Sequence, residues 1–355
     1  MHTFSLPAPE VADRMLSWYD AHRRVLPWRE DPLPYHVWLS EIMLQQTQVQ
    51  TVIPYYTRFL EALPEVSDLA EVSPTKLHKL WEGLGYYSRA DHLKEAAELI
   101  MTAHGGLLPE SYDELLALPG VGPYTAGAIA SIAFGERVAA VDGNVLRILS
   151  RLTAYDGPIN VASSAKPLKE LAQALVPAHR PGDFNQSLMD LGAMVCSANG
   201  APHCDACPLA ELCAAKRENL AWLLPIKKAK KPRSVEAHTI ILLTAGKEVW
   251  IRKRPQKQLL AGLWEFLDVP GALSQDEVLA LLKEKGLAPL ALEDLGKAKH
   301  LFTHKEWHMQ GWRASLPAPT PFADGIWVPA IALRTTYAMA GALAAYRHQL
   351  SNNLL

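Results

Sequence analysis

The sequence contains no uninterrupted apolar run of about 18 residues, so we expect no membrane-spanning helix. Its first residues, Met1 to Pro7, lack the charged and apolar segments of a secretory signal, and we therefore expect a cytoplasmic protein. Neither charge is in excess, because 35 Lys and Arg residues face 37 Asp and Glu residues. A nucleic-acid surface would therefore have to be a local basic patch.

Cysteine is scarce, and the four residues of this type, Cys196, Cys204, Cys207 and Cys213, lie in one short stretch with the spacing C-x7-C-x2-C-x5-C. Scattered structural thiols would not cluster in this way, and a cytoplasmic chain has little use for two disulfides. Zinc sites usually combine two short cysteine pairs, whereas one C-x2-C occurs here. The spacing favours a cubane iron–sulfur cluster, with zinc and a purely structural set of thiols as the alternatives.

The 355 residues, 49% of them apolar and 20% charged, indicate a globular chain of about two domains. In the first part, apolar residues recur at three- and four-residue steps, which predicts an all-α domain over residues 1–222. The clearest helical stretches are 37–52, 90–104, 124–134 and 143–153.

Residues 225–233 contain two prolines, five cations and no acid, so we predict a basic linker over 223–235. A solvated linker is the simplest interpretation, although Lys227, Lys228, Lys230 and Lys231 could also meet phosphates. Residues 236–355 then predict an α+β domain, with a β-hairpin over 238–244 and 248–252 and a helix over 274–286.

Residues 118–127, with the sequence Leu-Pro-Gly-Val-Gly-Pro-Tyr-Thr-Ala-Gly, separate two helical patterns. Gly120 and Gly122 permit a tight turn with unobstructed backbone N–H groups, and at a helix N-terminus these donors would suit a DNA phosphate. A plain connection between helices is the alternative, but L-P-G-V-G between two helices favours a helix-hairpin-helix motif.

Two acidic residues are candidates for chemistry, and each also has a purely structural interpretation. At helical spacing, Glu41, Gln45 and Gln48 would share one face within an apolar segment. Glu41 is then either exposed on a polar stripe or buried with a raised pKa, in which case it could donate a proton near neutral pH. Asp142, in Asp-Gly-Asn before an apolar helix, has the pattern of a turn and an N-cap.

Taken together, these features resemble the adenine DNA glycosylase (MutY) family of helix-hairpin-helix glycosylases, over most of the first 215 residues. The resemblance implies an all-α glycosylase domain with a [4Fe-4S] cluster, followed by a MutT/Nudix-like domain. It also implies a first cysteine gap of six residues, whereas this chain has seven. The matching segments are 26–29, 38–48, 83–90, 118–127, 141–144 and the cysteine run.

The resemblance implies a base-flipping hydrolase that removes adenine mispaired with 8-oxoguanine or guanine in double-stranded DNA. Glu41 would be the general acid that protonates adenine, and Asp142 would stabilise the oxocarbenium-like sugar. Asn144 would orient Asp142 or the attacking water, and Tyr124 would pack beside the site. Related endonuclease III-type enzymes have a Schiff-base lysine at the position of Tyr124, so we expect a monofunctional glycosylase without strong lyase activity.

The resemblance also assigns residues that contact the DNA. Gln45 and Tyr86 would fill the gap left by the flipped base, although Tyr86 alone could be an ordinary aromatic in a glycine-rich loop. The expected set of substrate and DNA contacts is Arg29, Gln45, Gln48, Tyr86, Gly120, Gly122 and Asp190 in the first part, with Arg29 and Asp190 near the adenine pocket.

The second part resembles the MutT-like domain that such enzymes use to recognise 8-oxoguanine. Its Arg252-Lys-Arg-Pro and Gly262-Leu-Trp-Glu-Phe266 segments match the start of a Nudix fold, but the R-E-x-x-E-E catalytic run is missing. Pyrophosphate hydrolysis is therefore not expected, because no carboxylate cluster would hold Mg²⁺. By the same resemblance, Phe302 would stack near the lesion, and Thr303 and His304 would hydrogen-bond it.

Three other functions compete with the adenine glycosylase. They are a glycosylase for mismatched thymine or another pyrimidine, a DNA-damage sensor without catalysis, and a Nudix hydrolase. Tyr124 and the MutT-like domain argue against the first, the pair Glu41 and Asp142 against the second, and the missing catalytic run against the third. We expect the protein to act as a monomer.

Overall fold

The computed structural model describes residue 4 and residues 6–229, 232–255 and 259–351 of the chain. By its contacts the chain forms two compact units, one of Met1–Glu71 and Asp91–Lys230 and one of Val72–Ala90 and Lys231–Leu355. Residues 72–90 are thus grouped with the C-terminal part, whereas the sequence analysis assigns them to the first domain. The domain boundaries at residues 222 and 236 stay a prediction. Among the described residues, no helix has both the length and the apolar character needed to cross a membrane.

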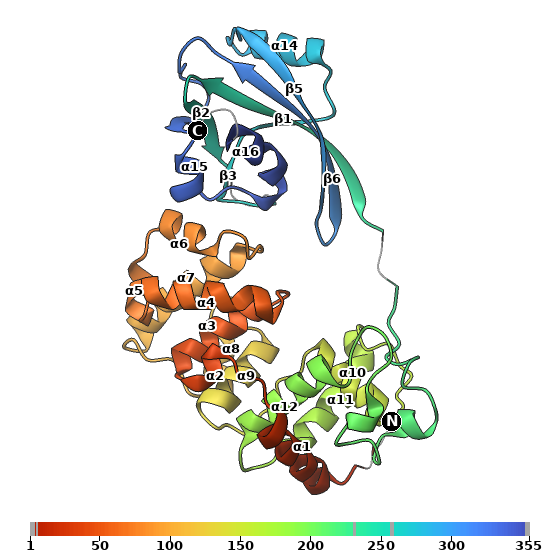
Figure 1. Ribbon diagram of the computed structural model, residues 1–355. Coiled ribbons are helices and arrows are strands. Elements are labelled where there is room, and N and C mark those ends of the chain that lie inside the picture. The colour runs from red at the N-terminus through yellow and green to blue at the C-terminus, as the bar shows by residue number, and fades with distance from the viewer. Residues whose placement is uncertain (1–3, 5, 230–231, 256–258, 352–355) are drawn as a thin grey trace. The chain divides into compact units, whose positions relative to one another are not determined.

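The first unit is helical, as the spacing of its apolar residues predicts (Figure 1). Its core includes the fully buried side chains of Met15, Leu149 and Phe184. Its elements are α1 (Ala8–His22), α2 (Pro27–Glu30), α3 (Pro34–Leu44), α4 (Val49–Ala62), α5 (Val66–Glu71), most of α7 (Ser88–Ala103), α8 (Tyr112–Leu116), α9 (Pro123–Ala133), α10 (Gly143–Leu152), α11 (Ala162–Leu175), α12 (Pro181–Met194), the 3₁₀ turn η1 (Cys204–Ala206) and α13 (Ala214–Arg217).

The helix predicted over residues 37–52 is in fact two helices, because α3 ends at Leu44 and α4 begins at Val49. Between them Gln46 adopts the left-handed conformation with φ of 57°, which cannot continue a right-handed helix. The prediction that Glu41, Gln45 and Gln48 share one helical face is therefore wrong. Gln45 follows the last residue of α3, and Gln48 immediately precedes α4.

The second unit is built on a twisted sheet with the strand order β3-β2-β1-β6-β5, in which β4 also pairs with β1 and β7 with β2. The central pair, β1 and β6, is parallel, and the other pairs are antiparallel. The predicted hairpin and the helix at 274–286 are both confirmed. The strands are β1 (Ser234–Ala245), β2 (Glu248–Lys253), β3 (Trp264–Glu265), β4 (Leu267–Pro270), β5 (Ala291–Leu301), β6 (Lys305–Ser315) and β7 (Ile326–Pro329).

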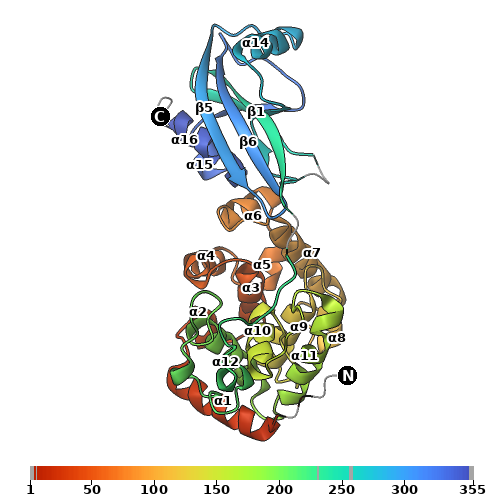
Figure 2. The same ribbon diagram turned by 90° about the vertical axis from the view of Figure 1, so that its right-hand side faces the viewer.

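Helices cover both faces of this sheet (Figure 2). Trp312 of β6 packs in a core with Val278 and Leu282 of α14 (Gln275–Glu284). The preceding residue, Gly311, points to the opposite face, where a Cβ atom would lie 2.1 Å from the ring of Tyr346 in α16 (Ala344–Ser351). Glycine is required at this position so that α16 can approach the sheet. The remaining elements are α6 (Pro74–Trp81), α15 (Ala332–Thr335) and the 3₁₀ turn η2 (Gly341–Leu343).

The first part of the predicted linker is exposed at residues 226–229 and makes a few hydrogen bonds with the helical unit. The backbone N–H of Ile159 donates to the carbonyl of Ile226 at 3.0 Å. The side chain of Asn160 bonds both to the backbone N–H of Lys228 at 2.8 Å and to its carbonyl at 2.9 Å. Two of the four lysines considered as phosphate contacts, Lys230 and Lys231, lie outside the described residues.

Candidate active site

The four residues predicted to be catalytic meet in one cavity of about 210 Å³ in the first unit. Glu41 comes from α3, Tyr124 from the first turn of α9 and Asn144 from the first turn of α10, which Asp142 precedes. Other residues of the cavity wall are Arg24, Leu26, Trp28, Arg29, Ser40, Gln186 and Met189. A base of planar shape and polar edges could be enclosed by such a wall.

Glu41 is buried, with 5% of its surface exposed, so the polar-stripe interpretation is wrong. Burial raises the pKa of Glu41 from 4.5 to about 7, and the negative charge of Asp142 adds to this, whereas a hydrogen bond from Tyr124 and the charge of Arg29 oppose it. Its Oε2 has no hydrogen-bond partner among the described residues. The carboxyl group can therefore carry a proton near neutral pH and offer it to a molecule in the cavity.

Tyr124 lies next to this carboxyl group at the start of α9. Burial raises the pKa of the Tyr124 phenol well above its ordinary value, and the charge of Glu41 raises it further. The hydroxyl group also lies 3.7 Å from Sδ of Met189. Tyr124 is therefore a neutral hydrogen-bond donor throughout the physiological range.

Asp142 is both an N-cap and a residue of the cavity wall, so its structural and functional interpretations are compatible. Its Oδ1 accepts hydrogen bonds from the backbone N–H groups of Asn144 and Val145, both at 2.8 Å, and its Oδ2 accepts one from Nδ2 of Asn144 at 2.6 Å. These bonds hold the carboxylate in one orientation at the N-terminal end of α10.

Arg147 supports this arrangement from the next turn of α10, and the sequence analysis missed it. Its guanidinium group donates to Oδ1 of Asn144 at 2.9 Å, to the carbonyl of Gly192 at 2.8 Å and to the carbonyl of Cys196 at 3.0 Å. Asn144 is thereby fixed with its amide N–H₂ toward Asp142. The sequence offered one signal for this contact: Arg147 lies three residues after Asn144, and residues three apart on a helix are neighbours.

Asp190 lies behind the cavity and anchors two arginines that line it. The Asp190 side chain is fully buried and accepts from Arg29 at 2.7 and 3.0 Å, and from Nε and the backbone N–H of Arg24 at 2.7 and 3.1 Å. Burial alone would raise the pKa of Asp190, but the two arginines hold it below its ordinary value. The predicted neighbours Arg29 and Asp190 are thus in contact. Arg24 was missed, because no motif distinguishes it from a surface arginine.

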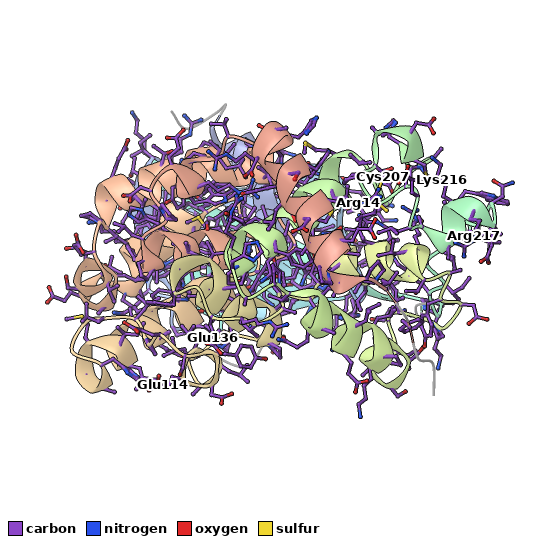
Figure 3. The ribbon with its side chains drawn as sticks, turned by 90° about the horizontal axis from the view of Figure 1, so that it is seen from below. Arg14, Glu114, Glu136, Cys207, Lys216 and Arg217 are labelled. Carbon is purple, nitrogen blue, oxygen red and sulfur yellow. The ribbon has the colours of Figure 1, made fainter. Side chains whose placement is uncertain are left out.

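The Leu118–Gly127 segment forms the predicted helical hairpin, with α8 before the turn and α9 after it. At the start of α8, the Ser111 side chain accepts from the backbone N–H of Glu114, and the Glu136 carboxylate accepts from that of Tyr112 at 2.7 Å (Figure 3 labels Glu114 and Glu136). Gly122 precedes α9, whose first N–H groups have no partner within the helix. This geometry suits an anion such as a phosphate.

Of the two glycines in the turn, Gly120 is the one whose backbone requires glycine. Its φ is 74°, and an added Cβ would lie 2.7 Å from Cβ of His92. We expect Gly120→Ala to lower the free energy of unfolding by about 1–3 kcal/mol. Gly122→Ala is the matched control, because its φ is −93° and no atom lies within 4 Å of the added Cβ. Urea unfolding of the two variants checks this prediction, and equal midpoints would contradict it.

Two of the predicted DNA contacts, Gln45 and Gln48, lie in the turn between α3 and α4. Nε2 of Gln45 donates to Oγ1 of Thr125 at 3.3 Å, which brings Gln45 to the residue after Tyr124. Gln48 is exposed at the start of α4. Neither residue lies on the helical face of α3 that carries Glu41. Each is adjacent in the chain to a residue of the cavity wall, Gln45 to Leu44 and Gln48 to Thr47.

In the second unit the structure brings together two of the residues predicted to contact the lesion. Tyr86 is in the left-handed conformation with φ of 47° and is 47% exposed. Its hydroxyl lies 2.8 Å from Oγ1 of Thr303. Thr303 and His304 are exposed and Phe302 is half-buried, all three in the connection between β5 and β6, which is called the 302–304 loop below.

The four cysteines line one small pocket, and none forms a disulfide. Arg151 of α10 donates to Sγ of Cys196 at 3.3 Å, and Sγ of Cys213 donates to the Arg151 carbonyl at 3.4 Å. Burial raises the pKa of Cys207 to about 11, and the other three thiols contribute to this increase. Thiolates gathered in this way repel each other unless a positively charged group lies between them.

Arg14 of α1 contacts the segment between Cys207 and Cys213 (Figure 3 labels Arg14 and Cys207). Its guanidinium group donates to the carbonyl of Pro208 at 3.4 Å and pairs with Glu211 at 2.7 Å. The seven-residue gap between the first two cysteines has other contacts, because Arg151 donates to the carbonyl of Ser197 at 2.8 Å and the N–H of His203 donates to the carbonyl of Val195 at 2.9 Å.

Comparison with known proteins agrees with both parts of the structure. The family model "HhH-GPD superfamily base excision DNA repair protein" matches residues 39–174, and that of the NUDIX domain matches residues 238–349. Among solved structures, a thermostable thymine-DNA glycosylase has a TM-score of 0.55 at 32% identity over 59% of this chain and 97% of its own. A non-covalent endonuclease III–DNA complex, at 23% identity and a TM-score of 0.52, covers 61% of this chain and 99% of its own and shares the fold.

Curated relatives match across both parts of the chain. The adenine DNA glycosylase of Rattus norvegicus is 37% identical over 90% of this chain and 73% of its own, and that of Homo sapiens is 38% identical over 90% and 70%. The adenine DNA glycosylase of Buchnera aphidicola subsp. Acyrthosiphon pisum is 33% identical over 87% of both chains. With its helix-hairpin-helix part, its NUDIX part and these relatives, the chain belongs to the adenine DNA glycosylase family.

Proposed function

We propose that this protein flips adenine out of double-stranded DNA and hydrolyses its N-glycosidic bond, as a step of base excision repair. The adenine that it removes is mispaired with 8-oxoguanine or guanine. One observation carries the proposal. A buried carboxyl group with a pKa near 7 and a free oxygen, that of Glu41, shares a cavity of about 210 Å³ with the capped carboxylate of Asp142. Mere binding to DNA requires no such pair.

The two carboxyl groups have separate tasks that follow from their surroundings. Adenine leaves poorly as an anion, so a proton must reach a ring nitrogen as the bond breaks. Glu41 supplies this proton from its free Oε2. The sugar is left as an oxocarbenium-like cation, and the negative charge of Asp142 stabilises it electrostatically. Asn144, held by Arg147, keeps Asp142 oriented while water completes the hydrolysis.

Extrusion of the base costs a few kcal/mol of stacking and pairing, and contacts with the DNA compensate for this cost. Gln45, Gln48 and Tyr86 would occupy the space beside the lesion, and the turn at Gly120 and Gly122 would bind a phosphate. Arg29 and Arg24, held by Asp190, would border the adenine pocket.

The base opposite adenine would be read by the 302–304 loop of the second unit. Oxidised guanine differs from guanine by an N–H donor at N7 and a carbonyl oxygen at C8. The hydroxyl of Thr303 and the imidazole of His304 can bond to such groups, and Phe302 can stack on the base. The missing Nudix catalytic run supports recognition rather than pyrophosphate hydrolysis as the role of this unit.

The products distinguish a monofunctional glycosylase from a lyase. With a duplex that contains one adenine opposite 8-oxoguanine, we expect strand breakage only after hot alkali, because the phenol of Tyr124 cannot form a Schiff base with the sugar. A single-turnover assay with and without alkali measures this, and a duplex with thymine opposite guanine serves as the control substrate. Breakage without alkali would contradict the monofunctional mechanism, and release of thymine alone would contradict the choice of base.

The cysteine pocket supports a [4Fe-4S] cluster as the cofactor. Cys196, Cys204, Cys207 and Cys213 line one pocket, and their spacing, with one C-x2-C pair, favours such a cluster over zinc. Such a cluster would link the segments that carry its four ligands and so stabilise the C-terminal end of the helical unit.

Analysis of the purified protein tests the cofactor directly. We expect a brown protein with about four iron atoms and four acid-labile sulfides per chain, as a [4Fe-4S] cluster requires. Stoichiometric zinc without sulfide would contradict this assignment. The monomeric state and the cytoplasmic location stay predictions, which sedimentation and cell fractionation can check.

A further inference from the structure

The 302–304 loop is fixed to the sheet of the second unit by its backbone. The N–H of Phe302 donates to the carbonyl of Lys305 at 2.9 Å, which closes the turn between β5 and β6. Nε of Arg233 donates to the carbonyl of Phe302 at 2.8 Å, and the N–H of Ser234 donates to that of His304 at 3.2 Å. The backbone is thus held, and the side chains need a separate support.

The side chain of Phe302 rests on the ring of Trp307, two residues into β6. The two ring centroids lie 5.0 Å apart with an interplanar angle of 71°, the edge-to-face geometry that aromatic pairs favour. The imidazole of His300 also contacts the Phe302 ring, with the two ring centroids 4.5 Å apart. Trp307 itself is 2% exposed and therefore belongs to the interior, although it contacts an exposed loop.

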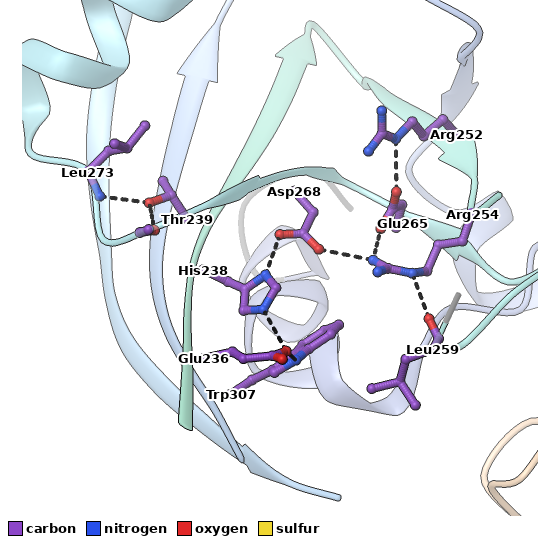
Figure 4. Close-up of polar contacts among 11 residues, drawn as sticks. Glu236, His238, Thr239, Arg252, Arg254, Leu259, Glu265, Asp268, Leu273 and Trp307 are labelled. Atoms are coloured by element: carbon purple, nitrogen blue, oxygen red, sulfur yellow. Dashed lines mark hydrogen bonds and ion pairs between the residues drawn. The ribbon is translucent and has the colours of Figure 1, made fainter. Parts of the chain in front are cut away.

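The orientation of Trp307 is set by polar contacts rather than by apolar packing alone (Figure 4). Its Nε1 donates to Oε2 of Glu236 at 3.1 Å, and the imidazole of His238 lies 4.2 Å from its ring. The guanidinium group of Arg254 lies 5.3 Å from the ring centroid, within range of a cation–π contact. Glu236 also pairs with Lys305, the first residue after the loop.

His238 and Arg254 belong to a largely buried network of charges that extends away from the loop. Nδ1 of His238 bonds to Asp268 at 2.8 Å, and Asp268 pairs with Arg254 at 3.0 Å. Arg254 also pairs with Glu265, which bonds to Nε of Arg252 at 2.8 Å. Asp268 and Arg254 are each 8% exposed and Glu265 is 1% exposed. Burial of so many charges is costly and does not by itself favour folding over an apolar core.

We propose that Trp307 is a positioning residue for recognition of the oxidised base. The network of Glu236, His238, Asp268 and Arg254 holds the indole in one orientation, and the indole holds Phe302 at the tip of the hairpin. The loop then meets the base already ordered, so that binding does not have to order it. This inference rests on the proposed function, in which the loop contacts 8-oxoguanine.

The test uses the full-length protein and two uncleavable duplexes, with an adenine analogue opposite 8-oxoguanine or guanine. The measured quantity is the ratio of the two dissociation constants. Trp307→Leu removes the ring beneath Phe302, and we expect the preference for 8-oxoguanine to fall by about tenfold, with little change in affinity for the guanine duplex. Glu236→Ala leaves the indole in place but removes the acceptor of its N–H, and we expect a smaller fall in the same direction.

The matched control is Trp312→Leu on the same strand, since Trp312 is 7% exposed and packs toward α14 instead of the loop. We expect Trp312→Leu to lower the free energy of unfolding without changing the ratio of the two dissociation constants. The thermal unfolding midpoints of all variants show how far each substitution lowers stability. An unchanged ratio in both Trp307→Leu and Glu236→Ala, or an equal fall in Trp312→Leu, would overturn the inference. Absence of any preference in the unaltered protein would instead refute recognition of 8-oxoguanine by the loop, and this inference with it.

Discussion

Glu41→Gln should lower the single-turnover rate of adenine release by about 10²–10⁴-fold, because the amide cannot donate the proton that the departing base needs. Duplex binding should persist, since the substitution changes neither the size of the side chain nor the residues that contact the DNA. A gel-shift measurement on the same duplex separates the two effects. The control is Glu61→Gln, which alters an exposed carboxylate on α4. A variant rate equal to that of the unaltered protein would contradict the assignment of Glu41 as the acid.

Glu41 should also make the activity and the stability of the unaltered protein depend on pH. Since the pKa of Glu41 is about 7, its protonated form, which acts as the acid, is lost above this pH, and the rate of adenine release by the unaltered protein should fall there. In the unfolded chain the group has its ordinary value of 4.5, so the folded protein binds the extra proton. The associated stability is fully present below pH 4.5 and is lost as the pH rises through about 7.

The difference between 4.5 and about 7 corresponds to about 3 kcal/mol at most. The amide side chain of the Glu41→Gln variant carries no charge at any pH. The free energy of unfolding of this variant should therefore exceed that of the unaltered protein at pH 8 and equal it at pH 4. Urea unfolding at the two values measures this. A variant that loses activity and gains stability at high pH would show that catalysis is maintained against the cost of a buried carboxylate.

Asp142→Asn should reduce adenine release by about 10²–10³-fold while the helix cap survives. Asparagine caps helices about as well as aspartate, so Oδ1 of the new side chain can still accept from the N–H groups of Asn144 and Val145. The amide would, however, turn a donor toward Nδ2 of Asn144 and would no longer carry the charge that stabilises the sugar cation.

Asp142→Ala provides the comparison, because it removes both functions. We expect it to lose activity and, in addition, about 1 kcal/mol of the free energy of unfolding from the missing cap. Single-turnover assays and urea unfolding of the two variants separate the cap from the chemistry. If Asp142→Asn released adenine within a few-fold of the normal rate, the electrostatic role of Asp142 would be refuted.

Local signals in the sequence were sufficient for much of the fold. Gly120 and Gly122 predicted the turn of the helical hairpin, and the apolar, β-branched runs 238–244 and 248–252 predicted a pair of strands, because each of these depends on a few neighbouring residues. The break after α3 was not predictable in the same way. Gln46 adopts a left-handed conformation, and no property of a glutamine side chain demands it.

The candidate site was less accessible to local reasoning, since it depends on contacts between distant residues. The residues around Glu41 left its burial undecided, because the cavity wall comes from α9, α10 and α12 as well as α3. The contact between Arg24 and Asp190 joins positions 166 residues apart. A resemblance to a known family identified Glu41 and Asp142, whereas the supporting Arg24 and Arg147 emerged from the structure.

The ion-paired group of Arg24, Arg29 and the fully buried Asp190 has a consequence for how this protein can vary over evolution. Loss of Asp190 alone would leave two arginines without the charge that balances them, and loss of Arg29 alone would leave a fully buried carboxylate paired only with Arg24, so either change should lower the free energy of unfolding. Selection should therefore remove a single substitution at one of these positions before a second substitution can restore the balance of charge. The three positions should be inherited as one unit, and descendants that depart from it should differ at all three together.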